Sequence, residues 1–420
     1  MDERDLEATG PRFPNDEEAI DAAEFATSFG EDLRQTLDLS TWQTGEDLTA
    51  VFDRLAREVQ EANRQEAGFL QHIREEIFPL IATRPGAPAA AGIWQVDPKD
   101  LERIHRGLLF NGGVEACDGT RLLHDTLPLT IFQLGVTLVS YQGNQGTWSQ
   151  RLYRRDLRAS TGESVDELIQ LLQRRGQRAG QNQPSRHDQL SELAQRGILA
   201  YAERAILLNK SKAPWRMGHG NPAPYELLTG SGSLDLMILA TRLIRELIEQ
   251  HQRFVFVTSE PADRVLLTIG QALHPLEFAI VQTLKDQIAP LVAYGHYRAN
   301  VTADLTWDGE KLAKPAEWIA RFRDEVASKV VMGVYRASAL APAQVFFAHA
   351  DHAHLAAQIA LADSVLQQHR GFPLLIDLAD QVCRHVFGRD SFAGPVDTAY
   401  TRAGAPWRYQ SERMTRATKE

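Results

Sequence analysis

The sequence has little of several residue types, and each shortage narrows what the chain can be. Only two of its 420 residues are cysteines, Cys117 and Cys383, and both lie among apolar neighbours. This usage indicates buried free thiols rather than a disulfide framework. No apolar run reaches the ~20 residues that span a bilayer, because charged residues interrupt the best candidate, 234–248.

The sequence also has no excess of basic over acidic residues, and its first residues do not look like a targeting segment. The formal net charge is −10 at pH 7, which argues against a general nucleic-acid coat because such proteins are basic overall. The first ten residues, MDERDLEATG, are acidic, unlike a signal or transit peptide. We therefore expect a cytoplasmic protein that does not act at a membrane.

The composition is that of a globular protein, with 43% apolar and 24% charged residues. Its length suits two or three domains of ~150 residues each. We expect an acidic and mobile segment at 1–30, an N-terminal helical region at 31–110, a core at 111–390 and a C-terminal tail at 391–420.

Hydrophobic periodicity predicts the order of the elements. A long helix is expected over 47–81, either covering its own domain or packing against a second copy of the chain. The core then begins with strands at 114–117, 129–141 and within TWSQRLYRRDL, followed by helices at 163–175 and 186–207. Next we expect a loop at 208–224, a strand at 225–229, a helix at 235–251 and further strands and helices to 386. Strands first in a meander, then alternating with helices, indicate a mixed α/β sheet.

One acidic residue follows the first strand of this core. Asp118 lies in EACDGT, directly before Gly119. Carboxylates gathered at strand ends from distant elements are how an α/β core builds a divalent metal site, although strand-Asp-Gly is also typical of a turn. The helix at 186–207 offers Glu192 or Glu203 as a second ligand, and Glu203 has the more apolar setting.

Two other clusters have both a functional and a structural interpretation. Arginine forks suit phosphate oxygens, so the run Arg151, Arg154, Arg155 and Arg158 predicts a nucleic-acid contact, or else a solvated face. HADHAH, at 349–354, offers histidines three apart for a transition metal, or else a polar helix start capped by Asp351.

The order of these motifs resembles the NurA family of nucleases. The resemblance covers roughly 110–390 and rests on CDGT, the meander, the helical Glu, LLTGSGSL and GFPLLIDLADQV. It implies an RNase H-like mixed sheet flanked by helices, after an N-terminal helical region. It also implies hydrolysis of DNA phosphodiesters with Mn²⁺ or Mg²⁺, by a homodimer that works with a hexameric HerA-type ATPase in DNA end processing or defence.

The resemblance assigns the metal ligands position by position. Asp118 matches the family's first Asp, with Thr120 in place of a Ser, and Glu203, or else Glu192, matches the helical Glu. Ser231 stands where the second Asp is expected, so the strands at 114–117 and 225–229 should be neighbours.

Later motifs depart from the family pattern as well. Phe372 replaces a Tyr and Asp380 replaces a His. The expected site is therefore Asp118, Glu203 and Asp380, with Ser231 as a weak neutral ligand. It should hold one tight metal ion and at most one weak one, and Ser231→Asp should raise metal affinity and activity.

Two alternatives stay open at this stage. A NurA-like protein that has lost cleavage would act as an assembly or DNA-binding partner of the ATPase ring, and the missing carboxylate, Tyr and His favour it. A small-molecule enzyme with a phosphate loop at 229–233 is disfavoured, because the stretch lacks a P-loop Lys and a full Gly-x-Gly-x-x-Gly.

Overall fold

The computed structural model describes residues 22–42, 48–125, 129–155, 165–178, 186–259, 263–294 and 305–404. The chain forms two compact units, Met1–Glu75 and Glu76–Glu420. Of the segment expected to be mobile, residues 1–21 lie outside the described part. No helix in the described ranges is both long and apolar enough to cross a membrane.

The first unit is helical. It contains α1 (Ala22–Phe29), α2 (Leu33–Leu37) and α3 (Leu48–His72). The helix expected over 47–81 is confirmed, since a π-helical turn at Ile73–Ile77 and α4 (Phe78–Ile81) continue from α3. Apolar side chains on α3 remain exposed within this unit, among them Phe52 at 60% and Leu55 at 54%.

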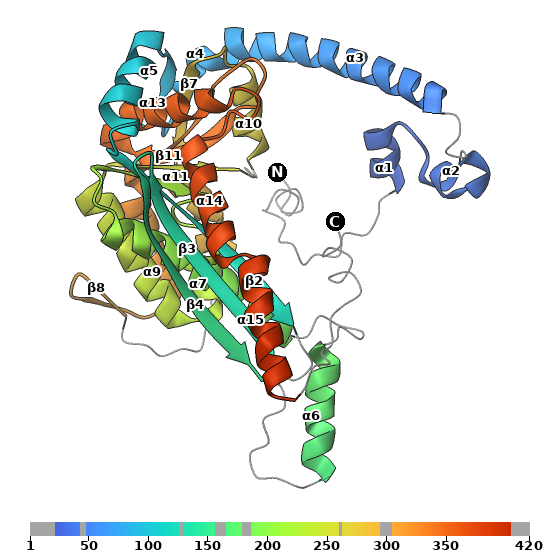
Figure 1. Ribbon diagram of the computed structural model, residues 1–420. Helices are drawn as coiled ribbons and strands as arrows, with labels where there is room; N and C mark the ends of the chain where they lie inside the picture. The colour runs from blue at the N-terminus through green and yellow to red at the C-terminus, as the bar shows by residue number, and fades with distance from the viewer. Residues whose placement is uncertain are drawn as a thin grey trace. The chain divides into compact units, whose positions relative to one another are not determined.

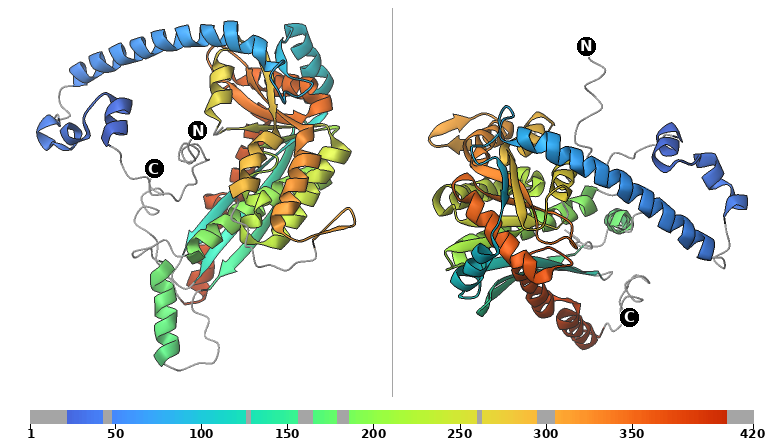
Figure 2. Two further views of the ribbon diagram at one scale, coloured as in Figure 1. Left: turned by 180° about the vertical axis from the view of Figure 1, so that it is seen from behind. Right: turned by 90° about the horizontal axis from the view of Figure 1, so that it is seen from above.

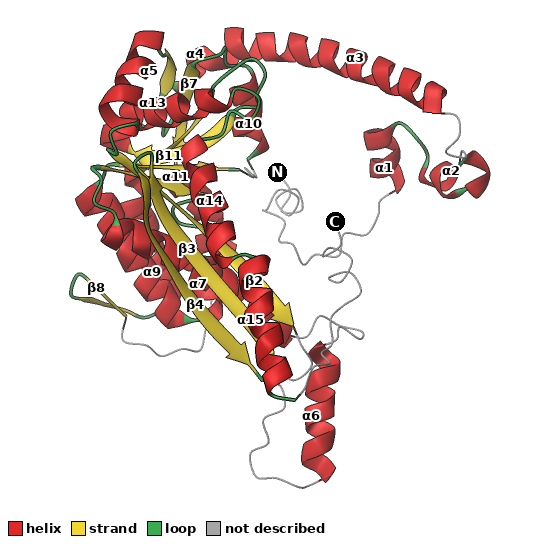
Figure 3. Cartoon of the chain, viewed as in Figure 1, coloured by secondary structure: helices red, strands yellow, loops and turns green. Residues whose placement is uncertain are grey.

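The second unit is built on one large sheet. Its strands are β1 (Gly92–Gln95), β2 (Val114–Asp125), β3 (Thr130–Ser140), β4 (Gly143–Arg154), β5 (Trp215–His219), β6 (Phe254–Thr258), β7 (Glu277–Thr283), β10 (Val330–Arg336) and β11 (Gln344–His349). Their order is β1-β7-β10-β11-β6-β5-β2-β3-β4, while β8 (Leu305–Trp307) and β9 (Glu310–Leu312) pair separately. β5 is parallel to both β2 and β6, and the other pairs are antiparallel. The predicted mixed α/β sheet is confirmed (Figure 3).

Helices cover both faces of this sheet (Figures 1 and 2). The helices of this unit are α5 (Pro98–Ile104), α6 (Val165–Arg178), α7 (Arg186–Lys210), α8 (Tyr225–Leu228), α9 (Leu234–Glu246), α10 (Arg264–Gln271), α11 (Leu284–Tyr294), α12 (Pro315–Arg321), α13 (Ala353–Ser364), α14 (Leu374–Phe387) and α15 (Arg389–Arg402). One core cluster joins the sheet to α7 and α9–α12, and a second joins its other face to α5, α13 and α14. β3 is buried at every position, because helices cover it on both sides.

Two expected elements were wrong. Residues 225–228 form helix α8 rather than a strand, and the expected loop at 208–224 contains β5. A run of four residues fits either period, so periodicity alone does not separate helix from strand. The sequence pattern did not predict β5 because this central strand contains a charged residue, Arg216. The Arg216 guanidinium can be buried because it donates hydrogen bonds to the backbone carbonyls of Leu207 and Ser211.

The strand that carries Asp118 also differs from expectation. β2 does not end at Asp118 but runs on to Asp125. Its parallel pairing with β5 ends at Cys117↔Gly218, so Asp118 lies where β2 loses that neighbour. Gly119 does not form a turn. A Cβ there would lie 2.6 Å from Glu203 Oε1, so the glycine makes room for a carboxylate from α7.

Contacts at both ends of α14 seat it on β2 and β3. A Cβ on Gly135 would lie 2.2 Å from the Phe387 ring, so the missing side chain admits that ring. Gln133 Nε2 donates to the Phe387 carbonyl at 2.7 Å. At the first turn, buried Asp363 accepts from Leu375 N at 2.8 Å and from the Tyr141 hydroxyl.

The contact between Gly135 and Phe387 yields a stability prediction. Gly135→Ala should lower the free energy of unfolding by about 1–3 kcal/mol, because the added methyl overpacks the ring. Phe387→Leu in the same chain should recover part of the loss, and urea unfolding of the four proteins of this double-mutant cycle measures both. If the two substitutions change the free energy of unfolding additively, the two residues do not contact each other.

Candidate functional site

Asp118 and His219 meet where neighbouring parallel strands end their pairing. Asp118 is 5% exposed, and its Oδ1 accepts from Gly119 N at 2.8 Å. His219 closes β5, and its Nδ1 lies 3.2 Å from the same Oδ1. Because the carboxylate can only accept, Nδ1 carries the proton in this contact.

His219 also reaches the next strand. Its Nε2 lies 2.9 Å from the hydroxyl of Ser259, which directly follows β6. Desolvation tends to lower the pKa of His219, but the hydrogen bond and negative charge of Asp118, together with Glu203, outweigh it and raise the pKa. The Phe372 ring stands edge-on to the His219 imidazole, with the ring centroids 5.7 Å apart. Residue 372 therefore contributes an aromatic ring beside His219 but no hydroxyl.

Glu203 reaches β2 from α7, on the opposite face of the sheet from α14. Its Oε2 accepts from Arg204 Nη1 at 2.7 Å, and its side chain is 16% exposed. The Arg204 guanidinium is 4% exposed and also donates to the carbonyls of Asn221 and Pro222, directly after β5. One buried cation therefore ties the helical carboxylate to the segment that follows His219.

Burial makes Glu203 a poor carboxylate to ionise. Desolvation is the largest cause, Asp118 adds repulsion, and together they raise the pKa of Glu203 to about 7 against the opposing charges of Arg204 and His219. A carboxyl that takes up a proton near neutral pH, close to other acids, is typical of functional sites.

Asp380 lies on α14 beside the same strand. Desolvation and the charge of Asp118 raise its pKa, while Arg384 opposes the shift. Arg384 Nε donates to Asp380 Oδ1 at 2.8 Å, from a side chain that is 71% exposed. The charge of Asp118 thus acts on both Asp380 and Glu203, which approach β2 from opposite faces of the sheet.

Ser231 is not on a strand beside Asp118. It follows α8 in a single 3-10 turn, Gly230–Gly232, with a left-handed φ of 49°. Its hydroxyl donates to the Glu226 carbonyl at 3.3 Å and faces Gly197 on α7. The place at the end of the strand next to β2 belongs to His219, which the sequence analysis assigned to a loop. Arg204 was missed as well, because nothing in a helical Glu-Arg pair announces a buried guanidinium.

The other candidates are separated from this group. Glu192 lies eleven residues before Glu203 in α7, about 16 Å along the helix, so Glu203 is the helical acid near Asp118. In HADHAH the helix start is capped by His349, whose Nδ1 accepts from Asp351 N, and not by Asp351. In the described part of the chain, no three His, Cys, Asp or Glu side chains are arranged closely enough to hold a metal as they stand.

The four arginines expected to bind nucleic acid do not share one face. Arg151 and Arg155 line a pocket, described below, whereas Arg154 alternates to the other face of β4. Arg158 lies outside the described residues. Both cysteines are buried and free, as predicted.

The donor set fits a divalent cation in its chemistry. Three carboxylates are ligands that Mn²⁺ accepts.

Comparisons with known proteins give structural matches only. No family model matches the chain, and no curated protein matches it. Among solved structures, the NurA nuclease from Sulfolobus solfataricus is 11% identical, with 84% of this chain and 98% of that chain covered and a TM-score of 0.42. A NurA bound to dAMP and manganese is 10% identical, covering 86% and 98%, at a TM-score of 0.38.

The pKa of Glu203 gives a pH prediction. A carboxyl whose pKa is about 7 when folded and 4.5 when unfolded binds its proton more tightly in the folded state. Its contribution therefore favours folding below about pH 4.5 and is lost as the pH rises to about 7. The melting temperature of Glu203→Gln minus that of the wild type should grow between pH 5 and pH 8. A difference that stays constant with pH would mean that Glu203 is ionised throughout.

Proposed function

We propose that this protein is a NurA-like, metal-dependent nuclease that hydrolyses DNA phosphodiesters. The observation that supports it best is the contact between Asp118 and His219, with Glu203 and Asp380 near enough to Asp118 that its charge helps to raise the pKa of each. Acids that repel one another in a buried setting gain from binding a cation. The DNA it acts on would be strand ends, in repair or defence.

Asp118, Glu203 and Asp380 would hold Mn²⁺ or Mg²⁺, with His219 beside them. The ion would activate water and stabilise negative charge on the phosphate. The residues of the chain do the rest. Arg204 holds the Glu203 carboxylate and reduces repulsion among the acids. His219 orients Asp118, and its raised pKa gives it a proton that it can donate to a departing oxygen.

One observation favours a second candidate function. Asp118, His219 and Ser259 form a hydrogen-bonded row across β2, β5 and β6, at 3.2 and 2.9 Å. An acid, a base and a hydroxyl at these distances also suit a serine nucleophile. Such an enzyme would hydrolyse esters without metal. The family resemblance and the two further acids favour the nuclease.

The partners of the nuclease follow the resemblance. We propose a homodimer that docks on a hexameric HerA-type ATPase and acts in the cytoplasm. The exposed apolar residues of α3, among them Phe52 and Leu55, supply a surface on which a second copy would exclude water. If cleavage is lost, the same surfaces serve the alternative, an assembly or DNA-binding partner of that ATPase.

Substitutions at the site separate these candidates. With manganese and end-labelled DNA, Asp118→Asn should reduce degradation to background and His219→Ala should reduce it about 10²-fold or more. His219→Asp should raise manganese affinity, because it restores an acid at the strand end. The Ser231→Asp gain expected earlier should not appear, since that position faces Gly197.

Ser259→Ala and Ser231→Ala are the matched controls. The nuclease keeps its rate in both. Ester hydrolysis that survives EDTA and disappears in Ser259→Ala would instead establish the serine enzyme. Full DNA degradation by Asp118→Asn would show that the site lies elsewhere.

Solution mass tests the assembly. The wild type should have twice the mass of one chain, and Phe52→Glu with Leu55→Glu should yield a monomer, because charges replace two exposed apolar contacts. Arg57→Glu, on the same helix, is the control. Light scattering of the protein, alone and mixed with the ATPase, measures dimer formation and docking. A wild-type protein that is a monomer in both samples contradicts the proposal.

A further inference from the structure

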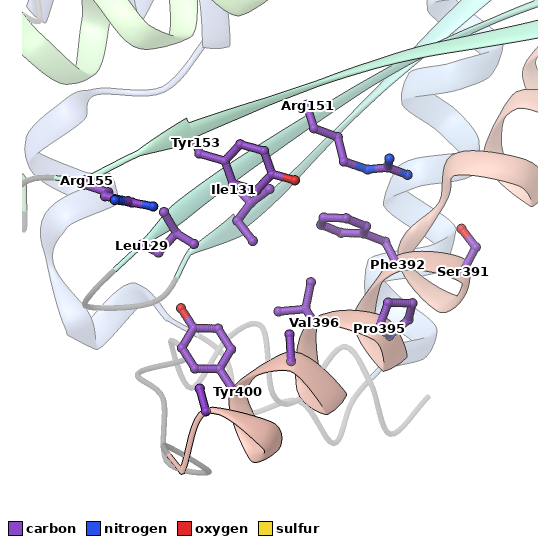
Figure 4. Close-up of a pocket in the computed structure, with 12 residues that line it drawn as sticks. Leu129, Ile131, Arg151, Tyr153, Arg155, Ser391, Phe392, Pro395, Val396 and Tyr400 are labelled. Carbon is purple, nitrogen blue, oxygen red and sulfur yellow. The ribbon is translucent and has the colours of Figure 1, made fainter.

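A cavity of about 690 Å³ lies away from the acids, between the far ends of β3 and β4 and the last helix, α15 (Figure 4). This volume is in the range of small-molecule pockets. Its walls are formed by Leu129, Ile131, Arg151, Tyr153, Arg155, Ser391, Phe392, Pro395, Val396, Ala399, Tyr400 and Ala403.

The lining combines flat rings with positive charge. Tyr153 faces Phe392 and Tyr400 across the cavity in Figure 4, and Arg151 and Arg155 stand on the strand side. Of the residues that line the cavity, none is Asp or Glu, in a chain whose net charge is −10. This chemistry suits an occupant with a planar apolar body and anionic groups.

Arg151 is held in place before anything binds. Its guanidinium lies over the Phe392 ring at 5.5 Å, and its Nε donates to Gln133 Oε1 at 2.7 Å. Gln133 in turn donates to the carbonyl of Phe387 on α14. Tyr153, by contrast, is 55% exposed, so its ring is available for stacking.

The cavity opens on the same face of the sheet as Asp118. Gln133 faces α14, and side chains alternate along a strand, so Ile131 and Thr137 share that face. Asp118 is the cross-strand partner of Thr137, and Tyr153 is the partner of Ile131. Ile131, at the cavity, and Thr137, beside Asp118, are six residues apart on β3, or about 20 Å. This distance is roughly six nucleotide steps of a B-form strand.

We propose that this cavity binds single-stranded DNA, with an unpaired base stacked on Tyr153 and the flanking phosphates on Arg151 and Arg155. Aromatic platforms beside arginines are how proteins hold single strands without sequence preference. A base inside a duplex is stacked and paired, and is not free to enter. The proposal rests on the proposed function, and it makes a single strand the form of DNA delivered to Asp118.

The test measures binding without cleavage. Fluorescence anisotropy of labelled (dT)12 in EDTA should show a Kd weakened about five- to fiftyfold in Tyr153→Ala and within about twofold of wild type in Tyr153→Phe. Arg155→Ala should reduce the slope of log K against log salt by about 0.7. Arg106→Ala, an exposed arginine of the α5 region paired with Glu102, is the control and should change neither quantity.

Unlabelled duplex should compete at least tenfold less well than (dT)12. Unchanged affinity in Tyr153→Ala, in protein whose melting curve matches the wild type, would overturn the proposal, and so would equal competition by duplex. The manganese nuclease assay is read separately. If (dT)12 binding depends on Tyr153 but the protein does not cleave DNA, the proposed nuclease function is wrong and the cavity proposal stands. If the protein cleaves DNA but binding does not depend on Tyr153, the cavity proposal alone is wrong.

Discussion

The parallel pairing of β2 with β5 is the constraint on which the site depends. It ends at Cys117↔Gly218, so Asp118, which lies within β2, and His219, the last residue of β5, follow the last pair of this ladder and their side chains meet. β6, parallel to β5, adds Ser259 one strand further on. Three short segments that are distant in sequence thus present polar groups in a row, because the carboxyl ends of parallel strands lie together.

Two glycines then allow helices on opposite faces to approach this edge. Gly119 leaves room for the Glu203 carboxylate from α7, and Gly135 leaves room for the Phe387 ring of α14. Each contact sets the height of a helix above the strand, and therefore where its acid lies. The site is assembled by close packing, which tolerates little change in volume.

The sequence predicts those parts of the fold that have a period. The meander, α9 and α14 each show one over many residues, and they were found. β5 was not, because its five residues include Arg216, whose buried hydrogen bonds exist only in the folded chain. The acids Asp118, Glu203 and Asp380 were proposed from the order of motifs. His219 and Arg204 could not be, since their roles depend on which strand neighbours β2.

Cations and protons offset the negative charges of these acids. Arg204 is fixed by backbone carbonyls and pairs with Glu203, but burial and the charge of Asp118 still raise the pKa of Glu203 to about 7, so that a proton can neutralise this acid. Arg384 covers Asp380 from an exposed side chain and can swing away at little cost. A cation that binds here would displace a proton and a mobile guanidinium, but not Arg204. Metal binding at these residues would therefore be coupled to pH.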